Sequence, residues 1–146
     1  MSETTSNGIP AQEQQPPGLT SKMSPLPDHG EQSWVGRNRL PGMKALITGG
    51  DSGIGRAVAI AFAREGCDVA LSYLPEEQSD AEDTQNWIEK SGARCFLLPG
   101  DITDEATARG VVDTAADLLG GLDVLVNNAG YGHLGRGHRQ TALAQI

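Results

Sequence analysis

Residues 45–57 read ALITGGDSGIGRA, a stretch in which a short apolar run leads through glycines into an amphipathic segment. This order predicts a strand, a tight turn and a helix. Gly49 permits a sharp turn off the strand, Gly53 permits the backbone to approach the phosphates of a ligand, and Gly55 lets the helix lie tightly on the sheet. The first amides of a helix lack carbonyl partners and lie at the positive end of its dipole. The stretch therefore predicts a site for a diphosphate.

A different phosphate-binding turn, the P-loop, is disfavoured by the residues that follow the glycines. That loop requires Gly-Lys followed by Ser or Thr, because the lysine reaches the terminal phosphates. The sequence has Gly55-Arg56-Ala57 at this place. The glycines therefore favour a dinucleotide over a nucleoside triphosphate.

Four short apolar runs predict the strands, at residues 45–47, 69–71, 95–98 and 124–126. Each run is continuous rather than alternating, as expected for parallel strands covered on both faces. Helical patterns separate the runs, so the chain alternates strand and helix. We therefore predict an α/β fold, a Rossmann-like doubly wound parallel sheet. It is incomplete, because a full sheet of this type has about six strands.

Each of the three predicted helices has its own limits. The first places Ile54, Val58 and Phe62 on one face and ends at Gly66. The second begins at residues 75–77, where proline and two acids suit a first turn, and ends near 91–92. The third runs from about 103 to 119. It has Val111, Ala115 and Leu118 on one face, and glycines at 120 and 121 end it.

Composition divides the chain into three parts. Residues 1–41 hold six of the eight prolines and few branched apolar residues, which predicts a flexible arm. As an alternative, residues 34–36 and 40–41 within it could dock on a surface. Residues 42–130 form the predicted nucleotide-binding half-domain. Residues 131–146 contain no acid, and we expect an atypical, disordered tail.

Charge and hydropathy exclude several classes of partner. The net charge of −8 and the pI near 4.7 disfavour nucleic acid, which is bound by clustered Lys and Arg. No apolar run approaches the roughly 18 residues of a membrane helix, and the first residues do not resemble a secretory signal. We therefore expect a cytoplasmic protein without a membrane partner. Cys67 and Cys95 have no metal-binding spacing and are interpreted as ordinary thiols.

Three motifs at the predicted strand ends resemble those of one family. Residues 48–55 follow the pattern Thr-Gly-x-x-x-Gly-x-Gly, Asp101-Ile102 follows the third strand, and Asn127-Asn128-Ala129-Gly130 ends the fourth. This set resembles the short-chain dehydrogenases/reductases, and in particular a bacterial subgroup with an extended N-terminal arm. The resemblance covers residues of roughly 17 to 130. A methyltransferase with a similar sheet is disfavoured, because its chemistry does not call for the Asn-Asn-Ala-Gly motif.

The resemblance implies an oxidoreductase that passes hydride between NAD or NADP and an alcohol or carbonyl carbon. Family members carry an acidic residue at the end of the second strand when they bind NAD, and counting places Tyr73 there. Leu74 and Ser52, where NADP-binding members often carry a basic residue, are neutral. NAD and NADP both remain open, with a slight preference for NADP. The expected cofactor-binding residues are Gly49, Asp51, Ser52, Gly53, Ile54, Gly55, Tyr73, Asp101, Ile102, Asn128, Ala129 and Gly130.

The family's catalytic residues are a serine and a Tyr-x-x-x-Lys pair, in which the lysine lowers the pKa of the tyrosine. The two tyrosines, Tyr73 and Tyr131, are followed four residues later by Glu77 and Gly135. No catalytic residue is therefore assigned, and we expect the chain to be inactive by itself. The alternative function is a non-catalytic fragment that binds nucleotide or associates with full-length relatives, which are expected to be homo-oligomers.

The composition of residues 131–146 suggests a hypothesis about the gene. All 19 acids of the chain precede residue 131, and the family's continuation would be a long helix and a fifth strand. We hypothesise that the reading frame is interrupted near residue 130. His133 and His138 are interpreted as parts of a solvated tail, so no metal site is expected. Without a neighbouring strand, residues 124–126 would form an open apolar edge.

Overall fold

The computed structural model describes residues 10–16 and 18–130. Four parallel strands form one sheet in the order β3-β2-β1-β4. They are β1 Lys44–Thr48, β2 Asp68–Tyr73, β3 Cys95–Pro99 and β4 Val124–Val126. This arrangement confirms the predicted Rossmann-like half-sheet. The chain order reverses between β1 and β4, where doubly wound folds bind their ligands.

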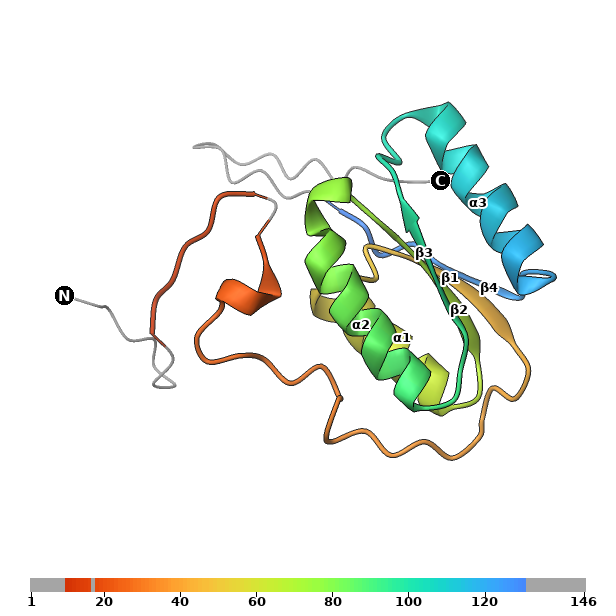
Figure 1. Ribbon diagram of the computed structural model, residues 1–146, viewed down its shortest axis with the longest axis horizontal. Coiled ribbons are helices and arrows are strands. Elements are labelled where there is room, and N and C mark those ends of the chain that lie inside the picture. The colour runs from red at the N-terminus through yellow and green to blue at the C-terminus, as the bar shows by residue number, and fades with distance from the viewer. Residues whose placement is uncertain (1–9, 17, 131–146) are drawn as a thin grey trace.

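Three helices cover the two faces of the sheet (Figure 1). α1 Gly53–Arg64 and α2 Gln78–Lys90 pack on one face, and α3 Glu105–Leu119 packs on the other. Alternate strand residues supply the two cores. Ile47 and Leu71 lie in the core with α1 and α2, whereas Leu46 and Ala70 lie in the core with α3. Short 3₁₀ turns lie at Thr20–Lys22 (η1) and Pro75–Glu77 (η2).

The ends of α3 show why its predicted limits are nearly right. Asp104 precedes the helix, and its carboxylate accepts a hydrogen bond from the Thr107 backbone N–H at 2.9 Å. The helix therefore begins at Glu105, rather than near residue 103. Gly120 follows the last turn with a φ of +76°, a left-handed conformation that favours glycine.

The predicted face of α1 is displaced by one residue, whereas that of α3 is right at Val111 and Ala115 and wrong only at its last member. In α1, Ile54 is 76% exposed, and the buried row is Gly55, Ala59 and Ala63. In α3, Leu118 is 43% exposed, whereas Leu119 is buried. Small side chains let the helix axis approach the sheet, so the row of Gly and Ala faces the strands. Val58 and Phe62 pack at the flank of that row and stay partly exposed.

The N-terminal segment, which comprises the described residues 10–16 and 18–43, lies along α1 and α2 before the chain enters β1 (Figure 1). The Glu65 carboxylate accepts hydrogen bonds from the backbone N–H groups of Arg37 and Arg39, at 3.0 and 2.9 Å. Leu40 packs against the core, and a Cβ on Gly36 would lie 1.9 Å from the Arg64 carbonyl oxygen. The composition predicts a flexible arm and does not indicate these contacts. The alternative, that residues 34–36 and 40–41 dock on a surface, anticipates two of the places where they occur.

A buried ion pair fastens the same segment to α1. The guanidinium of Arg56 lies 2.6 Å from Glu31 Oε1 and 2.7 Å from Asp83 Oδ2. Arg64 donates to the carbonyl oxygens of Gly30, Glu31 and Trp34. Side chains of α1, together with Glu65 just after it, therefore hold the segment in place. Within residues 10–16 and 18–130, no helix has the length and hydropathy needed to cross a membrane.

Candidate functional site

The glycine-rich turn joins β1 to α1, at the carboxyl end of the sheet. Gly49 and Gly53 have φ values of +65° and +54°, which side chains rarely adopt. A Cβ on Gly55 would lie 2.1 Å from the Gly49 carbonyl oxygen, so no other residue fits there without a shift of the backbone. A Cβ on Gly53 would meet nothing within 4 Å among the described residues. The turn is thus tight on its inner side and open on its outer side.

Asn128 locks this turn to the end of β4. Its side-chain amide donates hydrogen bonds to the carbonyl oxygens of Thr48 and Gly49, at 3.1 and 3.2 Å. In return, the Thr48 hydroxyl oxygen accepts bonds from the backbone N–H groups of Asn128 and Ala129, at 3.1 and 3.0 Å. The glycine turn and the Asn-Asn-Ala-Gly motif therefore form one hydrogen-bonded unit.

The start of α1 offers hydrogen-bond donors to a ligand. The first amide of the helix bonded within its own turn is that of Arg56, which donates to the Ser52 carbonyl oxygen at 3.1 Å. The amides of residues 53–55 precede this bond and have no carbonyl of an earlier helical turn to meet. The helix dipole adds a partial positive charge at the same place. These groups fit a diphosphate.

A cavity of about 720 Å³ opens over the carboxyl ends of the strands. Its size lies within the roughly 300–1,000 Å³ of small-molecule sites. Nine of the twelve residues expected at the cofactor line it: Gly49, Asp51, Ser52, Tyr73, Asp101, Ile102, Asn128, Ala129 and Gly130. The structure therefore brings together residues from the ends of all four strands.

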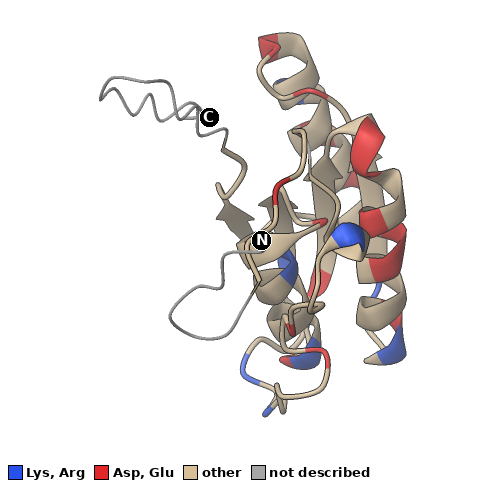
Figure 2. Cartoon of the chain, turned by 90° about the vertical axis from the view of Figure 1, so that its left-hand side faces the viewer, with Lys and Arg blue, Asp and Glu red and all other residues tan. Residues whose placement is uncertain are grey.

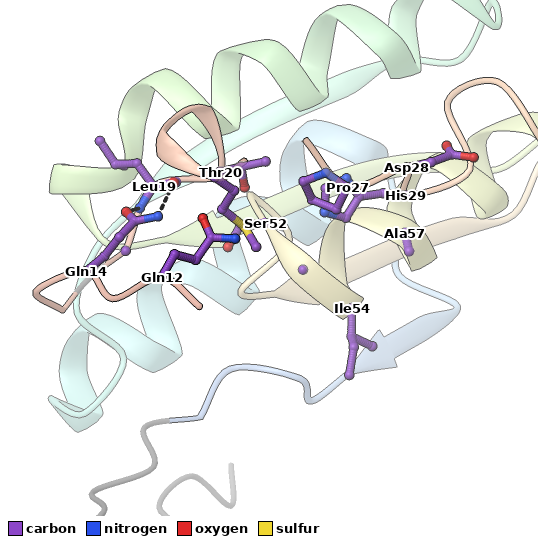
Figure 3. A pocket seen from close by; sticks show the side chains of 13 residues that line it. Gln12, Gln14, Leu19, Thr20, Pro27, Asp28, His29, Ser52, Ile54 and Ala57 are labelled. Atoms are coloured by element: carbon purple, nitrogen blue, oxygen red, sulfur yellow. Dashed lines mark hydrogen bonds between the residues drawn. The ribbon is translucent and has the colours of Figure 1, made fainter. Parts of the chain in front are cut away.

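The remaining three expected residues lie beside this cavity. Gly53 and Ile54 line a second cavity of about 640 Å³, between the N-terminal segment and the start of α1 (Figure 3). Gly55 lines neither cavity, because its place is behind the turn against Gly49. In Figure 3 the Gln14 side chain is hydrogen-bonded to the backbone of Leu19, which shapes the rim.

Tyr73 belongs to the core more than to the cavity. Only 3% of the residue is exposed, and its hydroxyl donates to Gln78 Oε1 at 2.5 Å. Burial, together with the charge of Glu82, raises the pKa of this phenol. The Tyr73 side chain is therefore a structural neighbour of the site, although its position in the chain is the one that the family pattern indicates.

Sequence reasoning missed several residues that line the larger cavity. Two belong to the N-terminal segment, and the others lie at or after the ends of β2 and β3: Pro16, Gly18, Ser72, Glu77, Gly100 and Thr103. The first two carry no signal, since composition assigns them to a flexible arm. In the sequence, Glu77 was identified only as one of two acids that suit the first turn of a helix. The N-terminal segment thus contributes to the wall of the cavity.

Asp101 is held in place by its own turn. Its Oδ1 accepts hydrogen bonds from the Thr103 hydroxyl at 2.7 Å and from the Thr103 backbone N–H at 2.9 Å. These two bonds lower the pKa of Asp101 below its ordinary value. The carboxylate therefore stays ionised and preorganised at the end of β3.

Neither cysteine offers a reactive thiol. Burial raises the pKa of Cys67 to about 11 and that of Cys95 to about 12. A thiol is nucleophilic as its thiolate, so both are inert near neutral pH. Among the described residues, no three His, Cys, Asp or Glu side chains lie close enough to hold a metal ion.

The sequence is similar to proteins from several bacteria. It is 56% identical over 121 residues to YghA, an uncharacterized oxidoreductase of Escherichia coli, covering 83% of this chain and 41% of that protein. It is 47% identical over 126 residues to general stress protein 39 of Bacillus subtilis, covering 86% and 44%. The chain thus spans about two fifths of the length of these curated relatives.

A solved structure shares the same half-sheet. The short chain dehydrogenase from Burkholderia cenocepacia, solved in complex with NADP, has 42% identity and a TM-score of 0.64. The match covers 66% of this chain and 39% of that one. The sequence profile described as short chain dehydrogenase matches residues 43–144, beyond residue 130, where we expected the resemblance to end. This chain belongs to the short-chain dehydrogenase family.

Proposed function

We propose that the chain binds a nicotinamide dinucleotide, NAD(H) or NADP(H), in the cavity at the carboxyl ends of the strands. The observation that carries the proposal is the joined turn of residues 48–55 and Asn128. It presents the amides that open α1 beside a cavity lined from every strand. The NADP complex of the Burkholderia relative supports the same ligand class.

Eight of the twelve expected residues have distinct roles in this proposal. The amides of residues 53–55 bind the diphosphate, and Asp101 and Ile102 border the adenine. Ala129 and Gly130 follow β4 and border the ribose next to the nicotinamide. Gly49 and Gly55 also shape the turn, since a Cβ on Gly49 would crowd Asn128 and a Cβ on Gly55 would crowd the Gly49 carbonyl oxygen.

As part of a longer protein, this half-domain would serve an oxidoreductase that passes hydride between the nicotinamide and an alcohol or carbonyl carbon. That role rests on the family and on relatives of which the chain covers about 41%. The chain contains no Tyr-x-x-x-Lys pair, so we propose that it binds the dinucleotide without turnover. Homo-oligomers of full-length relatives stay a prediction.

Titration of the purified chain with NADH tests binding directly. We expect a saturable change of nicotinamide fluorescence that excess AMP reverses, because AMP occupies the adenosine end of the same cavity. A panel of aldehydes and ketones should cause no NADH oxidation in parallel samples. Fluorescence that rises only in proportion to added NADH would contradict the proposed binding. Oxidation of NADH would contradict the proposal that the chain binds the dinucleotide without turnover.

A further inference from the structure

Thr84 holds the glycine-rich turn from α2. Its hydroxyl oxygen lies 2.8 Å from the carbonyl oxygen of Asp51, which is inside the turn. A carbonyl oxygen only accepts hydrogen bonds, so the hydroxyl is the donor. Thr84 has no exposed surface and lines neither cavity, so it reaches the turn from the interior of the protein. Among the described residues, it is the one donor to this carbonyl oxygen.

Arg56 sets the direction in which the Thr84 hydroxyl donates. Its Nη1 lies 3.2 Å from Thr84 Oγ1, and a guanidinium only donates hydrogen bonds. The hydroxyl oxygen therefore accepts from Arg56, and its single proton is directed to the Asp51 carbonyl oxygen. The guanidinium is held in turn by Glu31 of the N-terminal segment and by Asp83 of α2, at 2.6 and 2.7 Å. Figure 2 shows acidic residues gathered along α2, to which Asp83 belongs.

The bond to Asp51 also fixes the direction of the next amide. A trans peptide group is planar, and its C=O and N–H point in opposite directions. The peptide group between Asp51 and Ser52 is trans, and its C=O is directed to the buried Thr84. The Ser52 N–H therefore points away from Thr84. Ser52 lines both cavities, and its amide donates to no described residue, so it can donate to a ligand.

The orientation of this peptide group decides the sign of the charge that a ligand meets. With the C=O turned inward, a ligand meets the N–H of Ser52 next to the amides that open α1. If the peptide group turned over, the ligand would meet the Asp51 carbonyl oxygen instead. A carbonyl oxygen carries a partial negative charge and would repel a diphosphate, whereas an N–H group attracts it. A group that holds the carbonyl oxygen inward therefore favours diphosphate binding.

We propose that Thr84 is a positioning residue for dinucleotide binding, whose hydroxyl keeps the Asp51 carbonyl oxygen turned inward so that the Ser52 amide faces the diphosphate. The inference rests on the proposed function. It adds a residue of α2 that belongs to none of the three sequence motifs and lines neither cavity. Through Arg56 and Glu31, the same set of contacts joins the N-terminal segment to the turn.

Titrations of the full chain with NADH, followed by fluorescence, and with adenosine, followed by ligand-observed NMR, test the inference. Thr84→Val keeps the side-chain shape without the hydroxyl, and NADH should bind about tenfold more weakly. Adenosine has no phosphate, so its affinity should not change. Thr84→Ser keeps the hydroxyl and should restore NADH binding to within about threefold. Ile88→Val is the matched control, because it trims a fully buried side chain of the same helix that does not bond the turn.

The Ser52 amide gives a measurement that needs no variant. When ADP is added to the unaltered chain, the amide proton of Ser52 should move downfield in the NMR spectrum, because a hydrogen bond to a phosphate oxygen deshields it. Binding of ADP without this shift would overturn the inference. In Thr84→Val most of the shift should be lost at saturating ADP. Thermal melts of Thr84→Val and Ile88→Val compare their losses of stability.

The other outcomes distinguish the inference from the function on which it rests. Unchanged NADH affinity of Thr84→Val would overturn the inference and leave the proposed function standing, and so would an equal loss in Thr84→Ser. Equal weakening of adenosine and NADH would show a general effect on the shape of the cavity, which also overturns the inference. If the unaltered chain bound neither NADH nor adenosine, the proposed function itself would be overturned.

Discussion

The glycine-rich turn and the N-terminal segment meet at the start of α1, yet different forces hold them there. The turn is fixed by backbone packing, since Gly55 lies against the carbonyl oxygen of Gly49 with no room for a Cβ. The N-terminal segment is fixed by side chains, chiefly the buried contact of Arg56 with Glu31. A constraint on the backbone selects glycine and is visible in a sequence. A contact between distant side chains leaves no such mark.

The largest effect is expected when the backbone packing of the turn is broken. Gly55→Ala would place a Cβ against the Gly49 carbonyl oxygen and the Asn128 amide, at 2.1 and 2.6 Å. Overpacking of this kind should lower the free energy of unfolding by about 3 kcal/mol, measured by urea denaturation. Gly110→Ala is the control, because nothing lies within 4 Å of its Cβ and a helix favours alanine. Equal stability of the two variants would contradict the packing.

A smaller loss is expected when the N-terminal segment is released. Arg56→Met removes the partner of Glu31, so the free energy of unfolding should fall by about 2 kcal/mol. Hydrogen exchange of residues 18–41 should accelerate at the same time. Arg109→Met serves as the control, since its pair with Glu105 is exposed and should contribute less than about 0.5 kcal/mol. Unchanged exchange in the segment would show that Arg56 does not hold it.

A still smaller loss of stability is expected when the hydrogen bonds between the glycine-rich turn and the end of β4 are removed. Thr48→Val keeps the side-chain shape but removes the acceptor for the amides of Asn128 and Ala129. The free energy of unfolding should fall by about 1 kcal/mol. Affinity for NADH should also fall, because residues 128–130 lose their position at the cavity. Thr114→Val, on the exposed side of α3, is a control for the substitution itself.

The smallest effect on stability is expected when acid weakens the contact between Glu31 and Arg56. Burial by itself raises the pKa of Glu31. Hydrogen bonds from its own backbone N–H, from Arg56 and from the His29 backbone outweigh this effect and hold the pKa below its ordinary 4.5. A lowered carboxyl pKa stabilises the fold above pH 4.5 and loses that contribution as the pH falls through the folded value. Glu31→Gln should therefore flatten the decline in stability below pH 4.5. A parallel decline in both proteins would argue against this role.

The same distinction explains what could be predicted from the sequence. Continuous apolar runs and glycines predicted the strands and the turn, because parallel strands and tight turns restrict residue types directly. The nine cavity residues were expected largely from the family resemblance, through motifs at the strand ends. The predicted face of α1 was displaced by one residue, because the large Ile54 suggests a core position whereas small residues such as Ala59 approach the sheet. In α3 only Leu118 was misplaced, since Val111 and Ala115 are buried as predicted. The contacts of residues 18–41 depend on pairs of polar side chains that are far apart in the sequence. A single sequence does not show which of these side chains pair with each other.

Hydrogen exchange of the full chain with and without saturating NADH tests most directly whether a dinucleotide binds at the carboxyl ends of the strands. We predict slower exchange in three segments that are far apart in sequence, at residues 49–56, 100–103 and 127–130, with little change in α3 after its first turn. Protection confined to other parts of the chain, or no protection at saturation, would contradict the assignment of the cavity.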